Sequence, residues 1–152
     1  MKPADIVKQY VAALETGDVD RAAGFLSDDF EVAGLTPLSI PRWQYVETLR
    51  GLLSAFPDLR FNLRDVHEEA GLIKATVHIT GTQERNLVVP VPDLPSVPAT
   101  GKCISLPDET QTFTVRGNKI ASLRVSVSPG GGFQGLYRQL GARLPVPSAI
   151  TG

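Results

Sequence analysis

The stretch Val115-Arg116-Gly117-Asn118-Lys119-Ile120, continued by residues 121–128 (Ala-Ser-Leu-Arg-Val-Ser-Val-Ser), decides the fold class of this chain. Apolar residues alternate with polar ones on either side of Gly117-Asn118, a pair that tolerates the positive φ of a tight turn. The pattern predicts two antiparallel strands, Glu109 to Val115 and Lys119 to Ser128. Because this hairpin follows a helical first third, we expect an α+β domain.

Helical periodicity is typical of the first third of the sequence. Apolar residues recur at three- and four-residue spacing over Ile6–Leu14, and Gly17 ends this first predicted helix. Asp18 is placed to cap a second, shorter helix that runs to Leu26. Residues 30–32 predict a short strand. A third helix is predicted within residues 41–57, because a proline stands at each end of an apolar stripe.

The remainder is predicted to be mainly β. Residues 59–68 and 72–82 form a hairpin around Glu69-Ala70-Gly71, and residues 133–140 form a short closing helix. Five prolines between residues 87 and 107 exclude a central strand. We therefore expect an extended loop there, or an edge that resists pairing.

These elements predict one domain over residues 1–144, followed by a flexible tail over residues 145–152. Three N-terminal helices followed by a strongly bent antiparallel sheet indicate a cone-shaped α+β fold with the helices packed on the concave side of the sheet. Such a cone leaves an internal pocket at its wide mouth, a usual place for a small ligand.

Composition restricts the partners that we expect. The 152 residues carry a formal net charge of −1 with no basic stripe, which argues against a nucleic-acid partner. No apolar run is long enough to span a membrane, and the start does not read as a signal peptide, so a soluble, cytoplasmic protein is expected. A lone cysteine, Cys103, cannot form an internal disulfide or a thiolate cluster. We expect no metal site, since the two histidines lack ligand-like spacing, and the sequence points to no cofactor.

Several short motifs occur in the order found in the SnoaL-like polyketide cyclases, a branch of the superfamily of nuclear-transport-factor-type and ketosteroid-isomerase-like proteins. Together they cover about residues 5–141. The motifs are Leu14-Glu15-Thr16-Gly17-Asp18, Ala55-Phe56-Pro57-Asp58-Leu59, Ile79-Thr80-Gly81-Thr82, Pro98-Ala99-Thr100-Gly101-Lys102, Val115 to Ile120, and Gly135-Leu136-Tyr137-Arg138-Gln139-Leu140-Gly141. The resemblance implies an α+β cone and a homodimer formed through the outer sheet face. Activities in the wider superfamily include polyketide cyclisation, steroid double-bond isomerisation and epoxide hydrolysis.

The sequence departs from this family at its usual acid. The last strand of the family generally carries Glu-His-Trp and, four residues after the Trp, a catalytic Asp; here Ser122-Leu123-Arg124 and Ser128 stand in those places. After Glu109 the chain contains no Asp or Glu at all. Serine does not transfer protons near neutral pH unless a base activates it. The chemistry implied by the resemblance is therefore either lost or relocated.

Two residues are candidates for a relocated acid or base. His78 lies among threonines on a predicted strand and could act as a base or orient a ligand, although a solvated or hydrogen-bonded structural histidine is the more common case at such a position. Glu109 is the last acid in the sequence, and a carboxyl group in an apolar pocket is what proton transfer at a carbonyl compound requires.

Further side chains are candidates for the pocket wall. Trp43 and Tyr45 begin the third helix, where either core or pocket positions fit, and Gln111 shares a strand face with Glu109. Arg124 would bind an anionic ligand if its face lined the pocket. Alternation favours the other interpretation, in which Arg124 and Ser128 lie on the wet face of the strand.

Three functions remain open at this point. The chain binds a small apolar or carbonyl-bearing molecule without catalysis, because the family acid is replaced. Alternatively, it is a cyclase, isomerase or epoxide-hydrolase-like enzyme with a relocated acid or base such as His78 or Glu109. The third possibility is a non-catalytic module that dimerises or binds a partner through the outer sheet face.

Overall fold

The computed structural model of the protein describes residues 2–144; the predicted tail, residues 145–152, lies outside this range. The helices are α1 (Pro3–Glu15), α2 (Val19–Ala23), α3 (Arg42–Ala55) and α4 (Gly132–Gln139). The strands are β1 (Leu26–Ala33), β2 (Ile40–Pro41), β3 (Arg64–Glu69), β4 (Leu72–Val77), β5 (Thr80–Thr82), β6 (Cys103–Ser105), β7 (Glu109–Arg116) and β8 (Lys119–Ser126).

The predicted helices all form, and local chemistry explains their limits. The Asp18 carboxylate accepts a 3.0 Å hydrogen bond from the Arg21 backbone N–H and so caps α2. Pro41 stands directly before α3, where its missing N–H costs nothing. One limit is corrected: Leu26 is the first residue of β1 rather than part of α2, because the helix ends before Gly24 and the chain turns into the sheet.

The main sheet has six strands in the order β2-β1-β8-β7-β4-β3. It is mixed rather than antiparallel, since β1 runs parallel to β8 while the other neighbours are antiparallel. This corrects the antiparallel sheet predicted from the sequence. The error has a physical origin: alternation identifies a strand and its faces, but it carries no information about the direction of a partner some 90 residues away.

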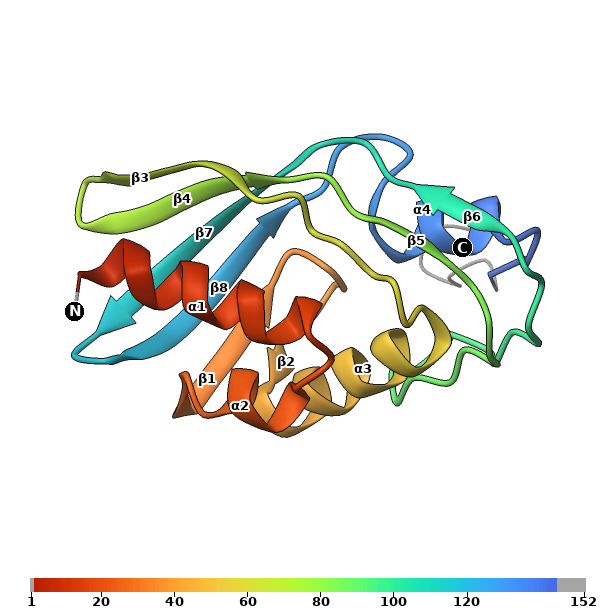
Figure 1. Ribbon diagram of the computed structural model, residues 1–152, viewed down its shortest axis with the longest axis horizontal. Coiled ribbons are helices and arrows are strands. Elements are labelled where there is room, and N and C mark those ends of the chain that lie inside the picture. The colour runs from red at the N-terminus through yellow and green to blue at the C-terminus, as the bar shows by residue number, and fades with distance from the viewer. Residues whose placement is uncertain (1, 145–152) are drawn as a thin grey trace.

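Helices α1, α2 and α3 lie on one side of this sheet (Figure 1). α1 contacts β3, β4 and β8, while α3 contacts β1 and β2. Between these layers lies one core that includes Tyr10, Phe30, Phe56 and Phe113, each at most 2% exposed. The helices therefore cover one face of the sheet, as the sequence predicts, and bury its apolar side chains.

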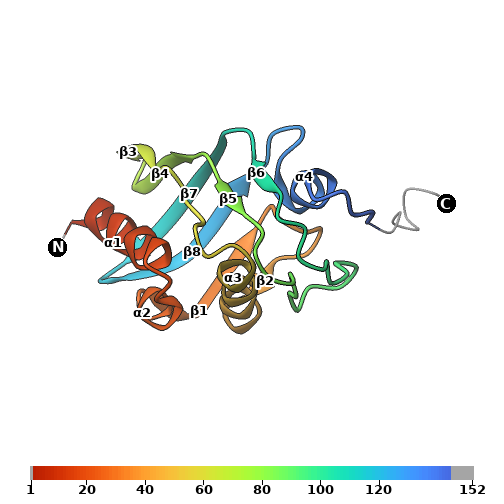
Figure 2. The same ribbon diagram turned by 45° about the vertical axis from the view of Figure 1, so that its right-hand side comes forward.

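Residues 87–107 form a loop that packs against the core. Leu87 and Val97 pair across an isolated antiparallel bridge, and Leu87, Val89, Val91 and Val97 are all buried. The loop ends in β6, which pairs with β5 in a separate two-stranded sheet. Turning the molecule shows this small sheet beside α4 (Figure 2). The proline-rich segment therefore covers the end of the fold at which α3 terminates.

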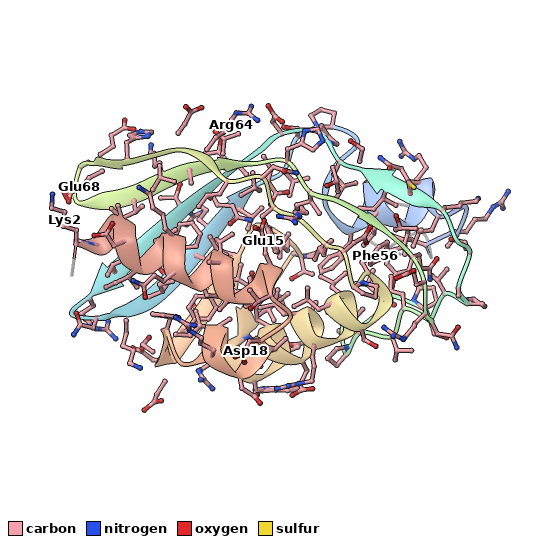
Figure 3. All side chains as sticks on the ribbon, in the orientation of Figure 1. Lys2, Glu15, Asp18, Phe56, Arg64 and Glu68 are labelled. Carbon is pink, nitrogen blue, oxygen red and sulfur yellow. The ribbon has the colours of Figure 1, made fainter. Side chains whose placement is uncertain are left out.

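The end of α1 is hydrogen-bonded to the segment that leads from α3 into the sheet. The carboxylate of Glu15, at the end of α1, accepts a 2.8 Å hydrogen bond from the Phe61 backbone N–H. In Figure 3 the labelled Glu15 lies between α1 and the segment that follows α3, and its side chain is half-buried. Residues 59–63, predicted as part of a strand, form no regular strand here: Arg60 makes an isolated antiparallel bridge with Thr80, and Asn62 adopts a positive φ of 48°, which interrupts the extended chain.

Within residues 2–144, no helix combines the length and apolar character that crossing a membrane requires.

Candidate functional site

A cavity lies between α3, β7, α4 and the small β5–β6 sheet. Most of its lining side chains are apolar, and the cavity has a volume of about 80 Å³. The lining residues are Leu35, Tyr45, Thr48, Leu49, Leu52, Phe56, Leu59, Phe61, Ile79, Ile104, Leu106, Glu109, Gln111, Val125, Gly132, Phe133 and Leu136.

Glu109 and Gln111 form the polar centre of this cavity. Side chains at alternate positions of a strand share a face, and in β7 residues 109, 111 and 113 are the buried ones. The Gln111 side-chain amide donates a 2.9 Å hydrogen bond to Oε2 of Glu109. Glu109 is only 5% exposed and is the one carboxyl group among the lining residues.

Burial changes the proton affinity of this carboxyl group. Loss of solvation raises the pKa of Glu109 above its ordinary value of 4.5, and the hydrogen bond from Gln111 opposes this shift only in part. A carboxyl group whose pKa is raised is a stronger base when ionised and holds its proton at higher pH. It is therefore better suited to proton transfer than an exposed glutamate.

Two tyrosines extend the polar centre toward the helices. The Tyr10 hydroxyl lies 3.3 Å from the Tyr45 hydroxyl and donates to it, so the proton of Tyr45 is left for another acceptor. Burial raises the pKa of Tyr45 to about 12, and the charge of nearby Glu109 adds to this effect. The pKa of Tyr10 is also raised well above its ordinary value, first by burial. Both hydroxyls remain neutral hydrogen-bond donors at physiological pH.

Three of the predicted site residues line the cavity, and the other predicted site residues do not. Tyr45, Glu109 and Gln111 all line the cavity. Trp43, two residues before Tyr45, is 62% exposed and lies on the opposite side of α3. It belongs neither to the core nor to the cavity wall, because a two-residue step on a helix turns the side chain away.

The predicted candidates on the last strand lie outside the cavity. In β8 the buried residues include Leu123 and Val125, whereas Arg124 is exposed, and Val125 is the one that lines the cavity. Ser128 donates a 2.7 Å hydrogen bond to the Asp108 carbonyl oxygen. The structure thus agrees with the interpretation in which Arg124 lies on the wet face of the strand.

His78 also lies outside the cavity. Its side chain is 37% exposed, and its Nε2 lies 2.8 Å from Oγ of Ser105. Its neighbour Ile79 lines the cavity instead. His78 is therefore not part of the cavity wall that holds Glu109.

Sequence reasoning did not identify Tyr10 and Thr48 as part of this region. Both are buried polar residues on helices, and Thr48 lines the cavity while its hydroxyl donates to the Gln44 carbonyl oxygen at 2.7 Å. A tyrosine within the apolar stripe of a first helix was the available signal, since a buried hydroxyl needs a partner. In the described part of the chain, no cluster of three His, Cys, Asp or Glu side chains is arranged to hold a metal ion.

Comparison with known proteins shows which family and which solved structures this chain resembles. Residues 7–123 match the SnoaL-like domain family. Among solved structures, AclR of Streptomyces galilaeus, described as a "putative hydroxylase", is 18% identical with a TM-score of 0.72; the alignment covers 90% of this chain and 93% of that one. A "putative polyketide cyclase" of Xanthomonas campestris pv. campestris is 19% identical, with a TM-score of 0.65 and coverage of 90% and 94%.

A third similar structure has no assigned function. It is an NTF2-like protein of Cytophaga hutchinsonii, 16% identical with a TM-score of 0.58, and the alignment covers 85% of this chain and 92% of that one. At these identities the likeness concerns the fold. No curated protein matches the chain. The match over residues 7–123, together with the helices on one face of a six-stranded mixed sheet, shows that this chain belongs to the SnoaL-like domain family and has an NTF2-like fold.

Proposed function

We propose that the cavity binds a small, mainly apolar organic molecule that carries a carbonyl group. The observation that supports this most directly is the pair Glu109 and Gln111, which lies in an otherwise apolar lining. Apolar walls favour a hydrophobic ligand, and a few convergent polar groups fix its orientation.

The polar groups of the cavity have hydrogens available for such a ligand. Tyr45 accepts from Tyr10, so its own hydroxyl proton can be donated to a carbonyl oxygen. The Gln111 amide uses one of its two hydrogens on Glu109 and retains the other. No lysine, arginine or histidine occurs among the described lining residues. The site thus favours a neutral acceptor over an anion.

A second candidate function is supported by Glu109 itself. Its raised pKa and its place in an apolar cavity suit a base that removes a proton from the carbon next to the ligand carbonyl. Donation from Tyr45 or Gln111 would stabilise the enolate that forms. We propose this as the relocated acid–base chemistry of the chain, with Glu109 in place of the Asp whose position Ser128 occupies. The reaction class is that of an isomerase or cyclase.

Binding is tested with prodan, a neutral naphthyl ketone whose fluorescence shifts to the blue in apolar surroundings. We expect saturable blue-shifted emission with the wild-type chain. Tyr45→Phe removes one donor and should weaken binding about fivefold, since a hydrogen bond contributes about 1 kcal/mol. Leu52→Phe narrows the cavity and should reduce binding, whereas Leu38→Ala alters a residue that is 82% exposed and should not. Emission that never saturates would contradict the binding proposal.

Catalysis is tested separately from binding with indanone in deuterium oxide. Nuclear magnetic resonance follows exchange of the protons next to the ketone. If Glu109 is the base, the wild-type chain accelerates exchange above the buffer rate and Glu109→Gln removes the acceleration, while prodan still binds. Binding without any acceleration in the wild type would leave the binding proposal standing and reject the enzyme.

A further inference from the structure

The outer face of the β5–β6 sheet carries an arrangement that the cavity does not use. Ile79, Ile104 and Leu106 line the cavity. Alternation directs the intervening side chains outward, so Ser105, the last residue of β6, is exposed, and His78 lies just before β5. The small sheet and the residues that adjoin it therefore contribute to the cavity wall on one side and present Ser105 and His78 on the other.

Distances show how these two side chains combine with a third. Oγ of Ser105 lies 2.8 Å from Nε2 of His78, and Nδ1 of the same imidazole lies 3.3 Å from Oδ1 of Asp108. The Nδ1–Oδ1 contact is an ion-pair distance, and a carboxylate at that place favours the tautomer with its hydrogen on Nδ1; Nε2 then carries the lone pair and can accept the serine proton. This order, serine to Nε2 and carboxylate to Nδ1, is that of a nucleophile, its general base and the group that orients the base.

Neighbouring contacts hold each member in place. The side chain of Gln139 clamps the backbone of Ser105: its Oε1 accepts from the Ser105 N–H at 2.9 Å, and its Nε2 donates to the Ser105 carbonyl at 2.8 Å. The guanidinium of Arg64 pairs with Asp108 and lowers the pKa of that carboxyl group, so the carboxylate stays ionised. Figure 3 shows the labelled Arg64 at the rim of the molecule, well separated from the labelled Phe56 of the cavity.

We propose that Ser105, His78 and Asp108 form a second, solvent-facing site in which Ser105 is a nucleophile toward activated esters. Ser105 Oγ bonds to the ester carbonyl carbon while its proton passes to Nε2 of His78. The tetrahedral species collapses with cleavage of the bond to the leaving alcohol or phenol, which takes the proton from His78. Water then attacks the acyl-serine by the same route, releases the acid and restores Ser105.

The class of substrate follows from the backbone amides around the nucleophile. The N–H of Ser105 donates to Gln139, and the N–H of Leu106 donates to the Ile79 carbonyl oxygen at 2.9 Å. Neither amide is free to stabilise an oxyanion, a contribution worth roughly 100-fold or more in rate. The site therefore suits esters with good leaving groups, such as aryl esters, rather than amides or alkyl esters.

Covalent labelling of the full chain tests this site. A fluorophosphonate probe reports the nucleophile by intact mass and peptide mapping, and para-nitrophenyl acetate reports the acyl-enzyme as a burst of one nitrophenolate per chain. We expect label on Ser105, with both signals lost in Ser105→Ala. His78→Gln keeps the serine and should slow labelling roughly 100-fold, the usual contribution of a general base. Ser126→Ala, at another exposed serine, should label as the wild type.

Two further measurements make the result decisive. His67 is an exposed imidazole that can itself react with aryl esters, so the burst must persist in His67→Gln. Asp108 is a positioning residue, and nitrogen-15 spectra should show the His78 ring as the Nδ1–H tautomer in the wild type, with that form reduced in Asp108→Asn. Label on other residues only, or a burst unchanged in a folded Ser105→Ala chain, would overturn the proposal.

Discussion

The side-chain amide of Gln111 donates a 2.9 Å hydrogen bond to the carboxyl group of Glu109, two residues away on the inward face of β7. This pair is the polar centre of an apolar cavity, and the sequence contains no acid after it. Burial stabilises this carboxyl group in its protonated form, so the stability of the fold should depend on the pH at which Glu109 titrates.

Glu109→Gln should change how stability depends on pH. The pKa of Glu109 is raised above 4.5 in the folded state, so the favourable contribution of its protonated form is complete below that value. The contribution is lost as pH rises through the folded-state pKa. Glutamine does not titrate, so the free energy of unfolding of the wild type should fall relative to that of the variant as pH rises. Urea denaturation at pH 4, 6 and 8 measures this, with exposed Glu31→Gln as the control. A constant difference at all three pH values would contradict it.

Gly34→Ala should be strongly destabilising. Gly34 has φ +99°, and a Cβ atom there would overlap the carbonyl oxygen of Val125. The side chain of Val125 lines the cavity. The clash and the backbone strain together should cost about 3 kcal/mol in the free energy of unfolding.

Gly117→Ala is the matched control for this prediction. Gly117 also has a positive φ, +64°, but a Cβ atom there meets open space. The substitution should cost about 1 kcal/mol, which is the conformational term alone. Equal losses in the two variants, measured by urea denaturation, would show that close approach to Val125 is unimportant.

Gln83→Leu should loosen the proline-rich loop. The Gln83 side chain is fully buried, its carbonyl oxygen accepts from the Thr100 N–H and hydroxyl at 3.2 and 2.6 Å, and its amide donates to the Val97 carbonyl at 3.0 Å. Leucine leaves these groups without their partner, so we expect a loss of about 3 kcal/mol and faster proteolysis between residues 87 and 102. Gln9→Leu, on half-buried Gln9 of α1, should leave the cleavage rate unchanged. Proteolysis at the wild-type rate in Gln83→Leu would argue against this role.

We also propose that two chains associate through the outer sheet face, which α1, α2 and α3 leave uncovered (Figure 1). Light scattering should then give twice the 16.3 kDa mass of one chain. A symmetric interface repeats each substitution on both copies. Thr114→Arg on β7 should therefore shift the protein toward monomer, whereas Ser54→Arg, exposed on α3, should not. A wild-type monomer would reject this interface.

Local patterns predicted the elements well because their causes are local. The Asp18 cap, the proline before α3 and the alternation in β7 and β8 each act within a few residues, and the structure has all of them. The same alternation places Val125 on the buried face of β8 and Arg124 on its exposed face. Prediction was wrong about the direction of β1 relative to β8, because strand direction depends on the path of the chain between them.

The sequence by itself determined the family, the order of the helices and of strands β1, β3, β4, β7 and β8, and the absence of any acid after Glu109; it did not reveal β2 and β6, and it merged β4 with β5. Only the tertiary structure decided which polar groups meet. It places Glu109 near Tyr45 in an apolar cavity, and it brings Ser105 of β6 to His78, 27 residues earlier in the chain, outside that cavity. Spacing along the chain specifies which face a side chain takes, whereas packing of distant segments specifies its neighbours. Neighbours determine proton affinity and therefore chemistry.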